Sequence, residues 1–426
     1  MSLSKHGKKS IVQWCDIPVD PSTDVISRLD AIDILNFSAT CRQWATICKN
    51  IDANFLKSGR PMLLTSQPDQ DGTRYKDDVR TGKFGIHDVS KKLSLSCERV
   101  GLQRRYWIGG KDDWLVTTNT KFAVELLNPI TGSTIPLPSL NKNQAGIKVN
   151  GCSRLHMCIC PILSVTFDPF TCFIQRVVLT RTPSQHNGYE AIAIFSFGLL
   201  AYTSDGEDVW KVLRNPTDND DGGFNYYPVD FHDAVNFNGR ILAVDEGGSI
   251  FAWDHHSEDL SPVKLPAPDV QLDDDSKRKM FYLAISPTSR LMLVCLFGHG
   301  TGYINKSMRM LRKPTDRFEH MDGILIQEFD DEKAEWRHLP SIGHDQSMFL
   351  GLNYPFYRRS VDLEADSVYV ADVVNNDVLI ASLKKDSTVC ITKQNFPINE
   401  THRVDNGYSV RTPMWFRPTD PVREKI

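Results

Sequence analysis

The stretch Arg240-Ile-Leu-Ala-Val-Asp245, Glu246-Gly247-Gly248, Ser249-Ile-Phe-Ala-Trp253 decides how most of this chain folds. Two runs of β-branched, aromatic and small apolar residues flank a glycine-containing turn, which is the pattern of a β-hairpin. A single hairpin is marginally stable in water, so further strands must pack beside it. The stretch therefore predicts a larger all-β domain.

The same layout recurs along the chain. From about Lys83 onward, helical periodicity gives way to short β-rich runs separated by Gly, Asp, Asn and Pro. The further hairpins that we predict pair residues 113–118 with 122–127, 281–286 with 290–295, 323–329 with 334–339, and 367–372 with 377–382. A spacing of roughly 40–50 residues is typical of propeller blades. We expect an all-β propeller of about six or seven blades, because radial packing leaves only short sheet edges. A pair of β-sandwiches is the alternative.

The first sixty residues carry helical signals instead. Asp20-Pro21 is a helix-start signature, because aspartate caps free N–H groups and proline fits the first helical position. One face of a later helix, which ends near Asn50, contains Cys41, Trp44, Ala45 and Cys48 at i, i+3, i+4 and i+7. Three short helices bury too little surface to be stable alone. The module should pack against a partner or, alternatively, cap the following domain.

The order of residues in this helical segment resembles the F-box. The matching residues are Trp14, Asp16, Ile17, Pro18, Asp24, Val25, Ile26, Leu29, Asp33, Leu35, Phe37, Cys41 and Trp44. In that family, the apolar positions divide between a small core and the groove of a Skp-type adaptor protein. The resemblance implies that the adaptor contacts are Ile17, Pro18, Ile26, Leu29, Leu35 and Phe37.

The β-rich part resembles the plant KIB-type propeller. The segments that carry the resemblance are residues 109–116, 126–132, 135–138, 177–180, 235–244 and 343–351. They occur in the family's order, and the resemblance runs from about Trp14 to Asp372. That family consists almost wholly of F-box proteins, so the two resemblances support each other.

Together, the resemblances imply an α+β multidomain chain. Its parts would be a three-helix F-box over residues 11–56 and a KIB-type propeller over residues 57–426. The implied function is substrate recognition in an SCF-type cullin-RING ubiquitin ligase. The F-box would bind a Skp-type adaptor, and through it a cullin, while the propeller holds an unidentified target protein. Such a subunit catalyses nothing, needs no cofactor and works in the cytoplasm, the nucleus or both. The rival functions are an interaction scaffold outside any ligase and a propeller hydrolase with a helical cap.

Charge and hydropathy narrow the choice of partners. The 49 basic and 53 acidic residues leave a formal net charge of −4, which gives no field to attract nucleic acid or an anionic membrane. The most apolar stretch, residues 191–201, is interrupted by Ser196 and Gly198 and is shorter than the ~20 residues of a spanning helix. The basic N-terminal residues are followed by no apolar signal segment. We therefore expect an intracellular protein that binds neither nucleic acid nor membrane.

The sequence contains few candidates for catalysis or metal binding. Cys152, His156, Cys158 and Cys160 could close a tetrahedral zinc site, but their spacing is not a standard one, and on a strand they would alternate into the core. Aspartate and glutamate cluster in turns such as residues 218–221 and 330–332. The Gly-Gly pairs lack the Lys-Ser/Thr of a phosphate-binding loop. We expect no metal site, no catalytic residues and no cofactor.

The longest polar insertion, residues 298–321, is the best candidate for target binding. Long loops on a rigid scaffold commonly carry recognition sites. Within this insertion, Met308, Met310 and Leu311 lie among the predicted target contacts Lys306, Arg309, Arg312 and Lys313. A basic and apolar strip suits an acidic or phosphorylated partner. A solvated loop without a partner is the alternative.

Overall fold

The computed structural model divides the chain into two compact units. One comprises residues 1–60 with 418–426, and the other residues 61–417. The structure describes residues 21–22, 25, 29, 37, 40–50, 61–66, 82–90, 93–98, 100–102, 105–119, 123–130, 132–138, 147–148, 174–186, 188–195, 198–216, 229–257, 261–270, 277–299, 320–372, 377–383, 389–394 and 413–417. No helix in these ranges has the length and apolar character needed to cross a membrane.

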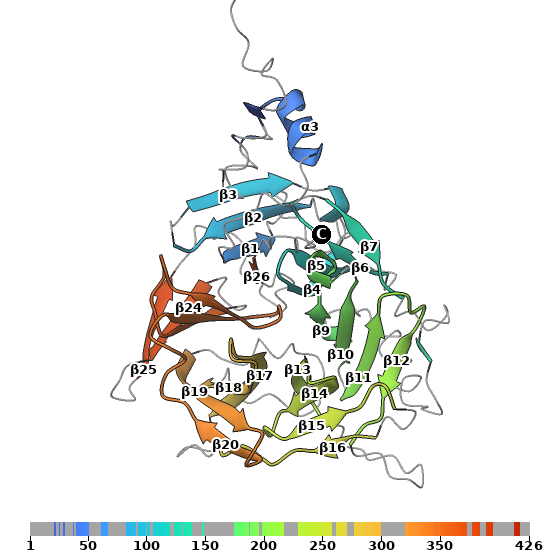
Figure 1. Cartoon of the computed structure of the whole chain (residues 1–426). Coiled ribbons are helices and arrows are strands. Elements are labelled where there is room, and N and C mark those ends of the chain that lie inside the picture. Colours follow the sequence, from blue (N-terminus) through green and yellow to red (C-terminus); the bar gives the residue numbers. More distant parts are fainter. Residues whose placement is uncertain are drawn as a thin grey trace, which may run out of the picture. The chain divides into compact units, whose positions relative to one another are not determined.

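The larger unit is built from antiparallel strands that follow one another in meanders (Figure 1). One sheet consists of β26 (Met414–Phe416), β1 (Met62–Ser66), β2 (Lys83–Asp88) and β3 (Leu93–Glu98). A nine-stranded sheet contains β4 (Tyr106–Lys111), β5 (Trp114–Thr118), β6 (Val124–Leu127), β7 (Thr134–Pro136), β8 (Ile147–Lys148), β9 (Ile174–Arg181), β10 (Glu190–Phe195), β11 (Leu199–Ser204) and β12 (Trp210–Leu213). It comprises two meanders, β4–β7 and β9–β12, which meet where β4 and β9 pair in parallel at Gly109 and Val177, and β8 pairs in parallel with β12 at the outer edge.

Three more sheets complete the described strands. The first comprises β13 (Phe231–Phe237), β14 (Arg240–Asp245), β15 (Ile250–Trp253) and β16 (Val263–Lys264). The second comprises β17 (Arg278–Ile285), β18 (Leu291–His299), β19 (His320–Asp330) and β20 (Glu335–His338). The last comprises β22 (Phe356–Arg359), β21 (Gln346–Leu350), β23 (Ser367–Asp372), β24 (Asp377–Leu383) and β25 (Val389–Gln394). Two short helices, η3 (Val100–Leu102) and α6 (Pro183–His186), lie between strands.

All five predicted hairpins are confirmed. The antiparallel pairs are β5 with β6, β14 with β15, β17 with β18, β19 with β20, and β23 with β24. In the hairpin of β14 and β15, Ile241 lies opposite Trp253 and Val244 opposite Ile250. Gly248 has a positive φ of 84° in its turn, a conformation that glycine adopts without steric cost.

The sheets stand around a common centre, so the fold is a β-propeller (Figure 1). Each sheet, or blade, packs between two neighbours, and its central strands are therefore apolar on both faces. In β10, every residue from Ala191 to Phe195 is buried. One core cluster joins Phe231 and Trp253 of one blade to Phe281 of the next. Alternating hydrophobicity is consequently weak in these strands, because neither face is left to solvent.

Tryptophan indoles tie neighbouring blades together. Four indole N–H groups each donate to a backbone carbonyl of an adjoining blade or of the segment that follows it. The pairs are Trp210 with Pro138 at 2.7 Å, Trp253 with Arg214 at 2.9 Å, Trp336 with Pro266 at 2.9 Å, and Trp415 with Leu350 at 2.7 Å. We call these contacts the tryptophan bridges. They combine a large buried ring with a satisfied polar group, which is how tryptophan is best accommodated in a core.

Strand β26 closes the ring. It pairs with β1 from Leu64 opposite Met414 to Met62 opposite Phe416, although the two strands lie far apart in the sequence. Trp415 is 1% exposed, and its ring meets that of Phe349 edge to face at 4.9 Å between centroids. One blade is thus assembled from strands at both ends of the larger unit.

The junction between β4 and β9 needs a glycine. A Cβ atom at Gly109 would lie 1.8 Å from the carbonyl oxygen of Val177, far inside any tolerated contact. Only hydrogen on the α-carbon lets the two backbones approach this closely. The glycine pair that begins the KIB-type resemblance therefore has a packing role.

Candidate partner-binding sites

In the smaller unit, helix α3 (Arg42–Asn50) is the predicted third helix, and it ends at the predicted residue. Its Trp44 ring stacks on Phe37, with centroids 4.0 Å apart and planes 8° from parallel. The backbone N–H of Trp44 donates to the Cys41 thiol at 3.5 Å, and Ile47 is 4% exposed. The face predicted from the i, i+3, i+4, i+7 spacing therefore carries the packed aromatic pair.

Two of the six predicted adaptor contacts can be placed. Phe37 is helical and half-buried against Trp44, and Leu29 is half-buried in irregular backbone. Ile17, Pro18, Ile26 and Leu35 lie outside the described residues. Pro21, Ser22, Val25 and Thr40 are also helical, and Pro21 follows the predicted helix start at Asp20-Pro21. Val25 is 48% exposed, which makes it a large apolar side chain open to solvent.

A buried polar cluster fills the centre of the propeller, and we call it the hub. Its ion pair joins Arg176 Nη1 of β9 to Asp233 Oδ1 of β13 at 2.9 Å. Arg176 Nη2 also donates to the carbonyl of Asn353 at 2.6 Å. The Tyr354 N–H donates to the Gly110 carbonyl of β4 at 2.8 Å. Segment 351–354, between β21 and β22, therefore lies in the middle of the ring.

The hub carboxylate is almost fully hydrogen-bonded. Besides Arg176, Asp233 accepts N–H groups from Ala234 at 2.8 Å and from Leu283 of β17 at 3.0 Å. Burial raises the pKa of Asp233 to about 6, while Arg176 and the two N–H groups oppose that rise. The carboxylate is thus ionised at neutral pH. Its oxygens bind donors of the protein itself, which is the arrangement of a structural ion pair.

The Lys111-Asp112-Asp113 turn joins three blades on one rim of the ring. Lys111 Nζ donates to the Thr180 carbonyl and lies 4.1 Å from the centre of the Tyr354 ring. Asp112 accepts from Arg417 Nε at 2.9 Å. Burial lowers the pKa of Lys111 to about 8, although the nearby Asp112 carboxylate favours its charge.

Asp113 and Trp114 extend these contacts. Asp113 Oδ2 accepts from Asn128 at 3.1 Å and from Ser184 of α6 at 2.9 Å. The Trp114 indole donates to the same Ser184 hydroxyl at 2.8 Å. The Gly-Gly-Lys-Asp-Asp-Trp segment is therefore a joint between blades, and every polar side chain in it has a partner from another part of the propeller.

The predicted target-binding residues Lys306, Arg309, Arg312 and Lys313 lie outside the described residues. The residues that flank their segment, His299 and His320, pair in register across β18 and β19. Strand β18 thus ends, and β19 begins, at the rim opposite the β17–β18 turn.

The candidate metal ligands Cys152, His156, Cys158 and Cys160 also lie outside the described residues. Among the residues that the structure describes, no group of three or more His, Cys, Asp or Glu side chains could hold a metal ion. His255 and His256 lie in a turn, with ring centroids 4.0 Å apart.

Sequence reasoning missed the hub entirely. Its members Arg176, Asp233 and Asn353 are separated by more than fifty residues each, and no local pattern marks them. The available signal was a charged residue within a short run that also contains β-branched or aromatic residues. Both Arg176, in Ile174–Arg181, and Asp233, in Phe231–Phe237, carry that signal.

Comparisons with known families agree with this architecture. A family model described as the KIB1-4 beta-propeller matches residues 84–393. A second model, described as the F-box domain, matches residues 14–56. A protein of Arabidopsis thaliana that is named as an F-box protein is 23% identical over 134 residues, which is 32% of this chain. The match spans 33% of that relative, so the chain aligns with about a third of its length.

Two solved structures are similar to this chain at low sequence identity and low TM-score. The β-propeller domain of Cps50 (Swd1) from Myceliophteria thermophila is similar with a TM-score of 0.35 and 9% identity, over 79% of this chain and 91% of that one. YCF48 bound to a D1 peptide is similar with a TM-score of 0.29 and 13% identity, over 64% of this chain and 70% of that one.

Proposed function

Because the chain belongs to the KIB1-4 β-propeller family and carries an F-box domain ahead of its propeller, we propose that it is the substrate-recognition subunit of an SCF-type ubiquitin ligase. The single observation that carries the proposal is the presence of both domains in one chain. F-box domains generally bind Skp1-type adaptors in SCF complexes, and a propeller offers a broad, rigid surface for a second protein. The chain would thus join an adaptor to a target.

The F-box side of the proposal assigns the adaptor contact to Ile17, Pro18, Ile26, Leu29, Leu35 and Phe37. The half-buried state of Leu29 and Phe37 supports it, because both side chains keep apolar surface that a partner can cover. Full burial of such a side chain contributes about 1.5–3 kcal/mol. The boundaries that we propose are 11–56 for the F-box and 57–426 for the propeller domain.

For the propeller, we propose that it binds the target protein and catalyses no reaction. The hub supports this, because its carboxylate and guanidinium bind each other and the backbone, whereas a hydrolase needs a free acid, base or nucleophile. We infer six blades, since the nine-stranded sheet contains two meanders and each other sheet one. Target contacts from Lys306, Arg309, Arg312 and Lys313 remain part of this proposal.

The proposed partners set the proposed location. Skp-type adaptors and cullins work in the cytoplasm and the nucleus, so we place the chain in either or both. No nucleic-acid or membrane partner is proposed. The net charge of −4 supports this, since such partners favour basic surfaces.

The deciding experiment is retention of a purified Skp-type adaptor on the immobilised full-length chain. The wild type should retain it, and the double variant Pro18→Ala, Leu29→Ala should lose most of it, because two apolar contacts are removed. Val263→Ala is the matched control, since Val263 is 62% exposed on β16 of the propeller. It should behave as the wild type.

Circular dichroism must show that all three proteins are folded at the same concentration. If the folded wild type retains no adaptor, the ligase assignment is wrong. An interaction scaffold outside any ligase would then be the better-supported function.

A further inference from the structure

We propose that an acidic protein segment, carrying carboxylate or phosphate groups, docks on an arc of three arginines at one rim of the propeller. The arginine arc comprises Arg181, Arg240 and Arg290, from three successive blades. The inference rests on the proposed function, because it names the chemistry of the target that the propeller would hold. Its residues are different from those of the basic strip at 306–313.

The three arginines lie at the same rim because the innermost strands run parallel around the ring. Asp233 of β13 bonds the Leu283 N–H of β17, and Asn236, near the end of β13, bonds Glu190 at the start of β10. Glu190 in turn lies opposite Arg181, at the end of β9. The carboxyl ends of β9, β13 and β17 therefore face the same way.

Each arginine follows or ends one of these strands. Arg181 is the last residue of β9, and Arg240 lies opposite Phe237 at the end of β13. Arg290 directly precedes Leu291, which lies opposite Ile285 at the end of β17. Three guanidinium groups are thereby set out along the inner edge of one rim.

The arc presents positive charge despite its ion pairs. Arg181 binds Glu190 at 3.0 Å, but the arginine side chain is 48% exposed and the glutamate 12%. Arg290 binds Glu328 at 3.1 Å, with exposures of 47% and 13%. The carboxylates lie deep and orient the guanidiniums, which protrude into solvent with unused N–H donors.

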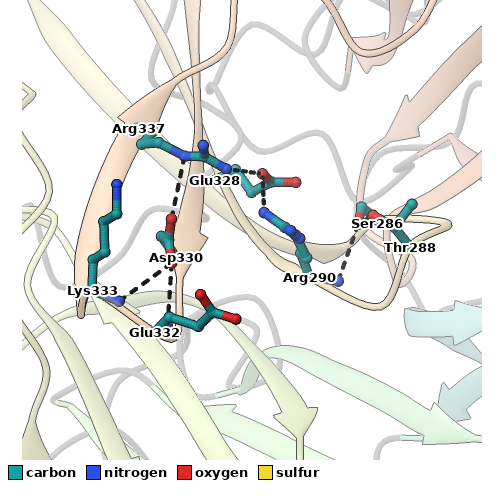
Figure 2. A network of polar contacts seen from close by, with 8 residues as sticks. All are labelled: Ser286, Thr288, Arg290, Glu328, Asp330, Glu332, Lys333 and Arg337. Atoms are coloured by element: carbon teal, nitrogen blue, oxygen red, sulfur yellow. Dashed lines mark hydrogen bonds and ion pairs between the residues drawn. The ribbon is translucent and has the colours of Figure 1, made fainter.

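Figure 2 shows that the blade of Arg290 carries a further arginine beside the arc. Arg337 of β20 shares the carboxylate of Glu328 with Arg290, at 3.1 Å, and is itself 50% exposed. Asp330 Oδ1 accepts the N–H groups of Glu332 and Lys333 at 3.2 and 3.3 Å, while its Oδ2 lies 3.8 Å from Arg337 Nε. Two protruding guanidiniums thus flank one recessed glutamate.

Arg240 is the most available member of the arc. It is exposed, and in the described part of the chain no carboxylate pairs with it. It follows the Asn238-Gly239 turn, where both residues have positive φ, of 50° and 75°. A tight two-residue turn fixes the backbone of Arg240 without covering its side chain.

The turns between the arginines contain no acid. Thr182–Gly188, Asn238–Gly239 and Ser286–Ser289 hold neither aspartate nor glutamate. At these three turns a negatively charged segment would thus meet guanidinium, amide and hydroxyl donors, while acids such as Asp205, beside Gly188, lie in the adjoining turns. The planar guanidinium fork matches carboxylate and phosphate oxygens in a bidentate manner.

The test is fluorescence anisotropy with the full-length chain and three labelled peptides of equal length: glutamate-rich, phosphoserine-rich and lysine-rich. Either anionic peptide should bind, and the affinity should fall as salt is added. The lysine-rich peptide should not bind. The two anionic arms tell whether carboxylate or phosphate is preferred.

The variants compare the arc with an arginine elsewhere. The triple variant Arg181→Gln, Arg240→Gln, Arg290→Gln should bind the anionic peptide about tenfold more weakly. Three exposed ion pairs with the peptide are lost. Arg359→Gln is the matched control, because Arg359 is 77% exposed and lies opposite Gln346 at the start of β21, outside the three turns. It should bind as the wild type does.

Equal loss in both variants, or no anionic binding by the folded wild type, would overturn the docking surface. Stronger binding of a single-stranded oligonucleotide of matched charge would also overturn it. Adaptor retention by the triple variant separates the two proposals. If the chain binds the acidic peptide but not the adaptor, the docking surface is supported and the ligase assignment is wrong.

Discussion

At the scale of single residues, the polar groups of this propeller bind one another across blades. Arg176 and Asp233 are the extreme case, with side chains 4% and 0% exposed. Removing either partner would leave an uncompensated buried charge, which typically costs about 3–5 kcal/mol. The same logic applies to Asp112, which receives Arg417 from the closing strand. These ion pairs between blades therefore fix how neighbouring blades contact one another.

His87 should make the propeller sensitive to acid. Its ring nitrogens contact Thr65 Oγ1 at 2.9 Å and Ser94 Oγ at 2.7 Å, and burial lowers its pKa from 6.5 to about 4. The unfolded chain therefore takes up a proton between pH 6.5 and 4 that the folded state excludes. The free energy of unfolding should fall as pH drops through this window, by on the order of 2–3 kcal/mol from this residue.

Urea unfolding at pH 7 and at pH 5 measures this dependence. His87→Gln should reduce the pH-dependent loss of stability, because no titrating ring remains. His338→Gln, at an exposed position of β20, should keep the full dependence. An unchanged pH dependence in His87→Gln would show that other groups cause the loss.

At the scale of elements, the tryptophan bridges define how a blade is joined to its neighbour. Each places an indole over apolar neighbours and its N–H on a carbonyl of the adjoining blade. Trp210, Trp253 and Trp415 are at most 1% exposed, whereas Trp336 is only half-buried. The joints are therefore of unequal strength, and the bridge from β20 is the most accessible to water.

Trp253→Phe should destabilise the propeller more than Trp336→Phe. The first change leaves the partly buried Arg214 carbonyl without its donor and a gap in the core, which together cost roughly 2–3 kcal/mol. At Trp336, water can replace the lost hydrogen bond, so we expect about 1 kcal/mol. Chemical denaturation of both variants gives the comparison, and equal losses would contradict the ranking.

The strands could be predicted from the sequence because their signals are local. Runs such as Arg240–Asp245 and Ser367–Asp372 are short, β-branched and bounded by turn residues, and their hairpin partners follow directly. The hub segment 351–354 and the pairing of β26 with β1 could not be predicted. Both depend on residues that meet only after the ring has formed, so no neighbouring pattern marks them.

The two candidate binding surfaces of the propeller differ in the same respect, because one is marked by residues close in sequence and the other is not. The residues Lys306, Arg309, Arg312 and Lys313 attracted notice because they are close in sequence. The arginine arc is spread over more than a hundred residues, and parallel inner strands bring it together. The six predicted adaptor contacts came from the F-box resemblance, since amphipathic spacing alone does not separate a core face from a docking face.

At the scale of the whole propeller, stability depends on ring closure. Trp415→Ala should remove about 3–5 kcal/mol, since the ring is 1% exposed, contacts Phe349 and bonds Leu350. The loss should lower the urea midpoint of the entire β unit, because β26 closes the ring.

Fluorescence and circular dichroism should record one shared transition in Trp415→Ala, at lower urea than in the wild type. Val263→Ala, at a solvent-exposed position, should stay within about 0.5 kcal/mol of the wild type. A separate early transition in Trp415→Ala, with the remaining blades unchanged, would mean that the blades are stable without closure.

The pairing of β26 with β1 also sets the order of events on the ribosome. Strand β1 is synthesised early, whereas the strand that covers its edge is the last to be made. Throughout that interval, β1 and its blade expose unpaired backbone groups and apolar side chains to other nascent chains. At about 5–20 residues per second, the interval lasts tens of seconds. Slow translation would therefore prolong the exposure of an open ring, and premature termination before residue 414 would leave an aggregation-prone fragment.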